Sequence, residues 1–420
     1  MDKHEHELRG LVTTIGRSHF MQVASSLMHA GVSVDLLQGW IVRDPAHSWF
    51  LRIASLFVGR DLVFGFKRRL LPGLEGHEYG DFFAEFVQAF GRRLFGRNRR
   101  CNEWFQKVGM IIHGWRAKRL MKKNNYDIFH VRTCFGRGGA VRYAKKHGIK
   151  VLADHSAGSP NFIIDTVYAE KGKCPWSLWW YAQKDAEEAD LLLVDCDWVK
   201  ETFTMYGYPK EKIRVVYMGL DQKFNGLRDW SSVDLSELGK SDGNPLQIVF
   251  SGPFMPHKGN EAFLAAVEKL CLTDLVFNVQ VIGSHGISEE QRARYPLAMA
   301  KIRFYGHVNQ DVMCEIMRDA HVYLFPSLSE GCAKSAFEAM SMGLCVVCTK
   351  ETGLPLVDGV DGHLILKNNP DSIVRKIQSL VSCPERIRET GLAATQTLKR
   401  FTWEAYAENV KKVYEELLNM

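Results

Sequence analysis

The sequence Ser327-Leu-Ser-Glu330-Gly-Cys-Ala-Lys334-Ser-Ala-Phe-Glu338-Ala-Met-Ser-Met-Gly343 lies between two short apolar runs, residues 321–326 and 344–349. Both runs have the length and composition of buried strands, and the residues from about 334 to 342 predict a helix that the final glycine ends. A strand, a glycine turn and a helix direct backbone N–H groups and the positive end of the helix dipole toward one point. This order predicts an anion site that suits a phosphate.

Two carboxylates, Glu330 and Glu338, lie beside this predicted anion site. Carboxylates repel a phosphate, so they are better placed to accept hydrogen bonds from hydroxyl groups. We therefore expect a phosphate ester that is rich in hydroxyl groups, and a nucleotide-sugar fits. The alternative is an ordinary strand–helix–strand unit whose acids are solvated.

Length and composition predict a two-domain globular protein. The chain has 420 residues, of which 46% are hydrophobic and 24% charged, and a single core rarely grows to that size. Its best candidate for a membrane helix, residues 49–66, contains Arg52, Arg60 and Asp61. The charged N-terminus lacks the apolar segment of a secretory signal, so we expect a cytoplasmic protein. Cys345 and Cys348 point to opposite faces of a strand, so we expect no metal site there.

The basic residues are concentrated in the first half of the chain. Residues 51–150 hold 22 Lys/Arg against 7 Asp/Glu, whereas the whole chain has a net charge of only +6. Within residues 45–123, cations alternate with Phe, Leu and Trp, which is typical of helices that lie on an anionic membrane. The alternative is a solvated helical insertion with its apolar side in the core. Nothing in this segment matches a nucleic-acid-binding module, so we expect no nucleic acid.

The chain opens with a strand, a helix and a second strand. The first strand, residues 8–15, ends at Gly16 and Arg17, which are expected to face a ligand at the carboxyl edge of the sheet. A single glycine is weaker than a full dinucleotide-binding fingerprint. The order nevertheless predicts a Rossmann-like half.

A later strand, residues 150–154, delivers His155 to the same edge of the sheet. Ligands of open α/β sheets bind at that edge, so this histidine is a candidate functional residue, although a structural role is the alternative. His130 also follows a strand but has more apolar neighbours, and we interpret it as a core histidine.

The second half begins with the strand Leu246-Gln-Ile-Val-Phe-Ser-Gly252, followed by the loop Pro253-Phe-Met-Pro-His-Lys258-Gly259 and a helix. This is a second glycine-bearing junction between a strand and a helix. Lys258 supplies a full positive charge beside the helix N-terminus. The pattern predicts a second phosphate contact, with an ordinary surface lysine as the alternative.

Several motifs together resemble the retaining glycosyltransferases of family four, which have the GT-B fold. They are the Glu-x7-Glu spacing of Glu330 and Glu338, the Glu-Ala-Met before a glycine, and Gly353 followed by Asp358-Gly-Val-Asp-Gly362. Residues 185–221 also resemble the end of the first domain in that family. The resemblance covers nearly the whole chain, is specific from about residue 185 onward, and is thin over residues 45–123.

The resemblance implies a role for each candidate residue. Glu330, His155 and Lys258 would be catalytic: the glutamate holds sugar hydroxyls, the histidine faces the reacting sugar, and the lysine stabilises the leaving diphosphate. The expected substrate-binding residues are Gly16, Arg17, Gly252, Val308, Gly331, Ala333, Lys334, Ser335 and Glu338.

One position departs from the family pattern. An arginine usually follows the first glycine of the loop after residue 252, and this chain has Pro253. Lys334 or Arg17 would have to substitute, or donor binding would be weaker.

The predicted fold class is α/β, with two Rossmann-like domains facing each other across a cleft and a C-terminal helix that returns to the first domain. The expected bounds are residues 1–228 for the N-terminal domain with its basic insertion, 229–245 for a linker, 246–400 for the donor-binding domain and 401–420 for the returning helix.

The predicted function is metal-independent transfer of a sugar, with retention, from a UDP- or GDP-sugar to a glycan or lipid-linked acceptor, as in polysaccharide biosynthesis. No cofactor or metal is expected. The chain would be cytoplasmic and in peripheral contact with the inner face of an anionic membrane through residues 66–123. Two alternatives remain: a catalytically silent nucleotide-sugar-binding or membrane-scaffold protein, and a sugar-nucleotide epimerase or hydrolase on the same fold.

Overall fold

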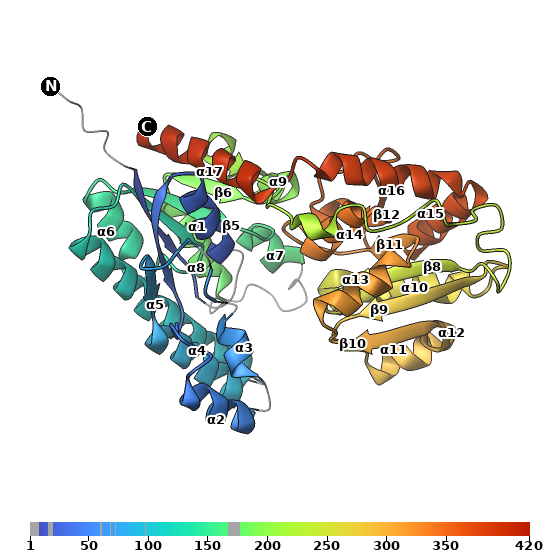
Figure 1. Ribbon diagram of the computed structural model, residues 1–420, viewed down its shortest axis with the longest axis horizontal. Coiled ribbons are helices and arrows are strands. Elements are labelled where there is room, and N and C mark those ends of the chain that lie inside the picture. The colour runs from blue at the N-terminus through green and yellow to red at the C-terminus, as the bar shows by residue number, and fades with distance from the viewer. Residues whose placement is uncertain are drawn as a thin grey trace.

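The computed structural model describes residues 8–15, 20–58, 61–67, 69–71, 73–96, 98–166 and 177–420. These residues form two parallel α/β units that lie side by side, with the N-terminal unit in blue and green and the C-terminal unit in yellow and orange (Figure 1). The predicted α/β class with two Rossmann-like sheets is confirmed.

The N-terminal sheet has seven strands in the order β3-β2-β1-β4-β5-β6-β7, and every neighbouring pair is parallel. Alternate residues of its central strands are buried on opposite faces, because both faces are covered by helices. Its strands are β1 (Arg9–Thr13), β2 (Ser33–Gln38), β3 (Glu78–Gly80), β4 (Ile128–Arg132), β5 (Lys150–His155), β6 (Leu191–Val194) and β7 (Ile213–Val215).

Helices join these parallel strands. They are α1 (Phe20–His29), α2 (Trp49–Val58), α3 (Leu62–Lys67), α4 (Phe82–Phe95), α5 (Arg99–Lys123), α6 (Ala140–Lys146), α7 (Pro160–Thr166), α8 (Trp179–Glu188) and α9 (Asp197–Met205), with 3₁₀ turns at Lys210–Lys212 and Gln222–Phe224. The segment interpreted as a basic insertion thus contributes α2 to α5 and the edge strand β3. In Figure 1, α2, α3 and α4 form the lower end of this unit.

The C-terminal sheet has six parallel strands in the order β10-β9-β8-β11-β12-β13. Its strands are β8 (Leu246–Ser251), β9 (Phe277–Ile282), β10 (Ile302–Gly306), β11 (Val322–Phe325), β12 (Cys345–Thr349) and β13 (His363–Ile365). Its helices are α10 (Asn260–Leu270), α11 (Glu289–Arg294), α12 (Pro296–Lys301), α13 (Gln310–Arg318), α14 (Lys334–Met342), α15 (Pro370–Ser382) and α16 (Glu385–Leu398), with 3₁₀ turns at Pro256–Lys258 and Lys350–Thr352.

The last helix, α17 (Trp403–Leu418), packs on the N-terminal unit, as predicted (Figure 1). Its apolar stripe contacts α1 and one face of the N-terminal sheet, and Tyr414 is fully buried there. The Tyr414 hydroxyl lies 2.8 Å from Nδ1 of His130. His130 is itself fully buried, which confirms its interpretation as a core histidine.

The segment expected to be a polar linker, residues 229–245, lies against the C-terminal unit. Three apolar residues anchor it, because Trp230, Leu235 and Leu238 are buried in the main hydrophobic cluster. The indole Nε1 of Trp230 donates a 2.8 Å hydrogen bond to the carbonyl oxygen of Gly343. The connection is therefore a packed segment and not a freely moving tether.

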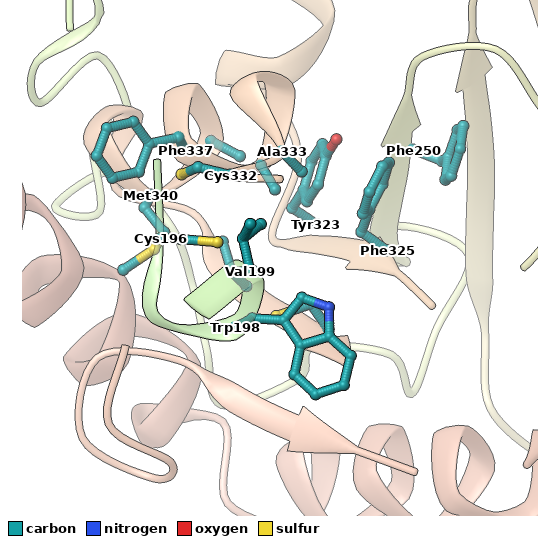
Figure 2. Packing of buried hydrophobic residues seen from close by; sticks show 14 of the residues in the cluster. Cys196, Trp198, Val199, Phe250, Tyr323, Phe325, Cys332, Ala333, Phe337 and Met340 are labelled. Carbon is teal, nitrogen blue, oxygen red and sulfur yellow. The ribbon is translucent and has the colours of Figure 1, made fainter. Parts of the chain in front are cut away.

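The two units share one hydrophobic cluster where they meet. Figure 2 shows Cys196 and Val199, at the start of α9, beside Cys332, Phe337 and Met340 of the α14 region. Lys350 adds a 2.6 Å ion pair to Glu201 across this junction. The carboxyl ends of both sheets are thereby brought toward each other.

Candidate active site

The start of α14 is fastened over the end of β8. The hydroxyl groups of Tyr323 and Ser335 lie 2.8 Å apart, and each lies within 3.0 Å of the carbonyl oxygen of Ser251. Tyr323 is fully buried on β11, between the two junctions. The two glycine-bearing junctions predicted from the sequence therefore converge on one place.

Lys258 and Glu330 form an ion pair at this point of convergence. The lysine comes from the loop after β8 and the glutamate from the loop after β11, and their side chains are 16% and 14% exposed. The Ser327 hydroxyl donates a 2.9 Å hydrogen bond to the same carboxylate. Both charged groups are therefore partly accessible at the same site. A ligand with a diphosphate and an attached sugar could contact both of them.

The close approach of these two loops depends on Gly259. Its φ is +76°, which favours glycine, and a β-carbon there would collide with the carbonyl oxygen of Pro326. The glycine after Lys258 therefore has a structural reason to be present. It lets the lysine lie beside the loop that carries Glu330.

The N-terminus of α14 offers backbone donors from Lys334 and Ser335. These residues open the helix, and no side chain caps it, so their N–H groups have no partner within the helix. The N–H of Ala333, by contrast, donates to the carbonyl oxygen of Thr352 at 3.0 Å. Of the three N–H groups expected to bind a phosphate, that of Ala333 is already occupied, and those of Lys334 and Ser335 remain.

Glu338 lies one turn further along α14 and is almost completely buried. Burial raises the pKa of its carboxyl group, and the positive charge of Lys334 opposes this shift. Lys334 Nζ lies 3.5 Å from the carboxylate and is itself two-thirds exposed. This glutamate is therefore a buried acceptor with an exposed cation beside it.

Gly252 ends β8 where three strand ends come together. Its N–H donates to Ile282 at 2.8 Å, and a β-carbon on Gly283 would meet the Gly252 carbonyl oxygen. Gly283 in turn donates to Gly306 at the end of β10. Val308 follows this turn and is half-buried. The three turns form one continuous rim at the carboxyl end of this sheet.

His155 ends β5 but is enclosed within the N-terminal unit. Its Nδ1 lies 2.7 Å from the Thr133 hydroxyl and its Nε2 lies 3.1 Å from the Gly158 carbonyl oxygen. Burial lowers the pKa of this imidazole to about 4, so it is neutral near pH 7. The loop after His155 nevertheless adjoins the loop between β11 and α14, which we call the donor loop. A β-carbon on Gly158 would lie 2.9 Å from the Ser329 hydroxyl of that loop.

Asp195 is a buried carboxyl group at the same junction, and the sequence patterns above did not point to it. It follows β6 and is 5% exposed, and its Oδ1 has no hydrogen-bond partner. Burial raises its pKa to about 7, while the N–H of Cys332 on the donor loop opposes the shift. The one sequence signal that could have indicated Asp195 is its position directly after the apolar strand β6.

A cavity of about 550 Å³ lies between α9 and the loop after β12. Its lining includes Trp198, Lys350 and Leu354 but neither member of the ion pair. The end of β12 contacts the donor loop, since the Thr349 hydroxyl donates to the Ser327 carbonyl oxygen at 2.6 Å. The cavity therefore belongs to the domain junction and is separate from the ion pair.

Two of the predicted substrate contacts, Gly16 and Arg17, lie outside the described residues. Among the residues that are described, no group of three or more His, Cys, Asp or Glu side chains has the arrangement of a metal site. Within the same residues, no helix is both long and apolar enough to cross a membrane.

Comparison with known proteins gives the family. The model of Glycosyltransferase Family 4 matches residues 18–224, and that of Glycosyl transferases group 1 matches residues 245–383. An uncharacterized glycosyltransferase of Methanocaldococcus jannaschii is 24% identical over 319 residues, which are 74% of this chain and 82% of the relative. The MMP alpha-(1->4)-mannosyltransferase of Mycolicibacterium hassiacum is 23% identical over 317 residues, 72% of this chain and 74% of the relative.

A solved structure shows the same fold. The Anabaena protein HepE, in complex with UDP and glucose, superposes with a TM-score of 0.61 and 15% identity over 97% of this chain and all of that one. The two family matches cover both sheets except for β1, and the ion pair and the start of α14 lie in the second match. The chain belongs to the family-four glycosyltransferases with the GT-B fold, also described as glycosyl transferases group 1.

Proposed function

We propose that this glycosyltransferase moves a sugar from a UDP- or GDP-sugar to a glycan or lipid-linked acceptor, with retention at the anomeric carbon and without a metal ion. The observation that carries the proposal is the ion pair of Lys258 and Glu330 beside the open start of α14. The UDP and glucose in the similar structure of HepE support the choice of donor class.

The main physical task is to stabilise negative charge on the departing nucleoside diphosphate. Lys258 supplies a fixed cation, and the N–H groups of Lys334 and Ser335 supply dipoles at a helix N-terminus. Such preorganised donors are effective because they need no rearrangement as the charge develops. A metal ion is not needed for this task when these groups act together.

The carboxylates hold the hydroxyl groups of the donor. Glu330 accepts from the hydroxyls of the transferred sugar, and it remains fixed because Ser327 and Lys258 hold it. Glu338, deeper on α14, accepts from the ribose, and the rim around Gly252 and Val308 receives the base. His155 stays neutral and positions the loop that forms the opposite wall.

Pro253 leaves the site with one arginine fewer than the family pattern. Lys334 is the substitute that the geometry favours, because its ammonium is two-thirds exposed at the start of α14. When a diphosphate binds, this side chain moves from Glu338 toward the phosphate. Arg17 is the second candidate.

We also propose that the acceptor is met at the inner face of an anionic membrane, which the chain contacts peripherally through residues 66–123. The excess of Lys and Arg in this part of the chain supports the proposal. A glycan acceptor that is linked to a lipid would be presented at the same surface.

The test is incubation with a panel of nucleotide-sugars, with and without a lipid extract, while the release of nucleoside diphosphate is measured. Turnover that requires an acceptor supports the transferase, and the anomeric proton signals of the product report retention or inversion. Pro253 favours one rival, a catalytically silent nucleotide-sugar-binding protein, which would bind a donor without turnover. An epimerase or hydrolase would instead consume the donor without any acceptor.

A further inference from the structure

The amphipathic helix α4 is oriented with its aromatic side toward solvent. Phe82, Phe83, Phe86 and Phe90 are between 41% and 71% exposed. Their positions fall on one face, since residues three and four apart along a helix are neighbours. The buried side of the helix carries only Ala84, Gln88 and Gly91. An apolar helix face normally points into the core, so this orientation requires an explanation.

The orientation of α4 is fixed by close packing against α5. A β-carbon at Gly91 would collide with Phe105, and one at Gly109 would lie 2.7 Å from the carbonyl oxygen of Ala84. The Asp81 side chain also fixes the start of α4 by accepting a 3.2 Å hydrogen bond from the Ala84 N–H. Turning the aromatic face inward would place bulky rings where only glycine fits.

The rings form a continuous row across α2, the segment after β2, α4 and α5. We call it the aromatic row: Trp49, Phe50, Trp40, Phe82, Phe86, Phe90, Phe105 and Trp104, together with Phe83, which packs against Phe82. Each ring contacts the next, with centroids between 4.9 Å and 6.3 Å apart. Trp49 and Trp104, at the two ends, are 71% and 59% exposed. Contiguous exposed apolar surface of this kind marks an interaction site.

The part of the chain that carries the aromatic row has an excess of cations, and two of its acids are held in ion pairs. Residues 49–123 contain 16 Lys/Arg and 6 Asp/Glu, a balance of +10. Glu85 is held by Arg69 through two hydrogen bonds of 2.6 Å and 2.7 Å, and Glu103 is held by Arg99. Arg93 is exposed at helical spacing from Phe86 and Phe90. The surface thus joins exposed rings to a local excess of positive charge.

We propose that the aromatic row is a membrane-docking surface whose rings enter the headgroup region of an anionic bilayer, with Arg93 and its neighbouring cations on the lipid phosphates. Phe and Trp partition to this depth, and each cation near an anionic leaflet adds to the affinity. The charge excess favours an anionic bilayer over a second copy of this chain, because two copies would bring like charges together.

This inference deepens the membrane contact proposed above and rests on it only for the acceptor. The proposed contact is now a defined set of rings and no longer a broad basic segment. This set includes residues of α2, which lies outside residues 66–123. It also requires no donor, so lipid docking and sugar transfer can be tested and refuted separately.

The test measures sedimentation of the full chain with vesicles of phosphatidylglycerol and phosphatidylcholine in equal parts, and with vesicles of phosphatidylcholine alone. The double variant Phe83→Ser/Phe86→Ser should bind the anionic vesicles about 100-fold more weakly, because each half-exposed ring contributes about tenfold. The matched control is Leu272→Ser, which removes a 75% exposed apolar side chain from the C-terminal unit. It should bind as the unaltered chain does.

A second variant, Arg93→Glu, tests the charge without removing a ring. It should weaken binding to the anionic vesicles by about tenfold or more and reduce the dependence on salt. Equal binding of the ring variant and the unaltered chain would overturn the proposal, as would an unaltered chain that fails to sediment with the anionic vesicles. Light scattering that shows a dimer dissociated by Phe83→Ser/Phe86→Ser would assign the aromatic row to a second copy instead.

Discussion

Replacement of Lys258 by methionine is the sharpest test of the candidate active site. Methionine keeps most of the lysine stem, which passes over the Phe325 ring with Nζ 5.4 Å from the ring centroid, and removes only the charge. A unit charge about 4 Å from a developing negative charge contributes about 4 kcal/mol at an effective dielectric constant near 20. Loss of that interaction, partly offset by the nearby helix amides, predicts a fall in kcat/KM of about 100- to 1,000-fold.

The same change should affect stability much less. It leaves Glu330 with the Ser327 hydroxyl and some contact with water, so the free energy of unfolding should fall by about 1–2 kcal/mol. The assay is release of nucleoside diphosphate from the preferred donor, together with urea unfolding. The control is Lys269→Met, which removes the same charge from a half-exposed ion pair to Asp371 in the same unit. A Lys258→Met variant with near-normal turnover would refute the reasoning.

Three further predictions follow from the junction around the donor loop. Asp195 keeps its proton in the folded state up to about pH 7, whereas in the unfolded chain it loses the proton near pH 4. The free energy of unfolding should therefore fall by up to about 4 kcal/mol between about pH 4 and pH 7. Urea titrations of Asp195→Asn should no longer show this dependence on pH. Gly331→Ala would place a β-carbon 2.6 Å from the Ser156 carbonyl oxygen and should abolish most turnover and lower the thermal midpoint, whereas Gly243→Ala, with only the tip of a serine side chain within 4 Å, should do neither. Turnover should survive a metal chelator, because Lys258 and the helix amides supply the positive charge; a rate restored only by added Mg²⁺ or Mn²⁺ would contradict this.

The sequence predicted a helix at about residues 334–342, and the structure has α14 at Lys334–Met342. Local chemistry accounts for this success, because Gly343 adopts a φ of +91° that ends a helix and that other residues rarely accept. The two strands on either side are short apolar runs that only a buried parallel sheet explains. The positions of Lys258 and Glu330 then followed from chain order, and the structure brings the two side chains together.

Other parts of the site depend on contacts that no local pattern contains. The N–H of Ala333 is occupied by Thr352, which lies 19 residues further along the chain. The ring nitrogens of His155 are occupied by Thr133 and Gly158, so its place at a strand end could be inferred but its enclosure could not. Gly16 and Arg17 remain predictions.

The segment from 45 to 123 shows what periodicity leaves undecided. The sequence indicated helices with an apolar face, but it could not say whether that face enters the core. The structure decides the matter at α4, because Gly91 and Gly109 permit a close approach to α5 only with the rings of Phe82 and Phe86 outside. The orientation of the rings thus depends on how α4 and α5 pack together, and the sequence of either helix alone does not predict it.

The return of α17 to the N-terminal unit has a consequence for biosynthesis. The ribosome makes β1 first and α17 last, yet Tyr406 and Tyr414 complete the hydrophobic layer over β1 and β5. The N-terminal unit therefore leaves the exit tunnel with one side of its sheet uncovered, while the C-terminal unit can finish folding first. A nascent chain stalled before residue 403 should be sensitive to protease in its earliest-made half.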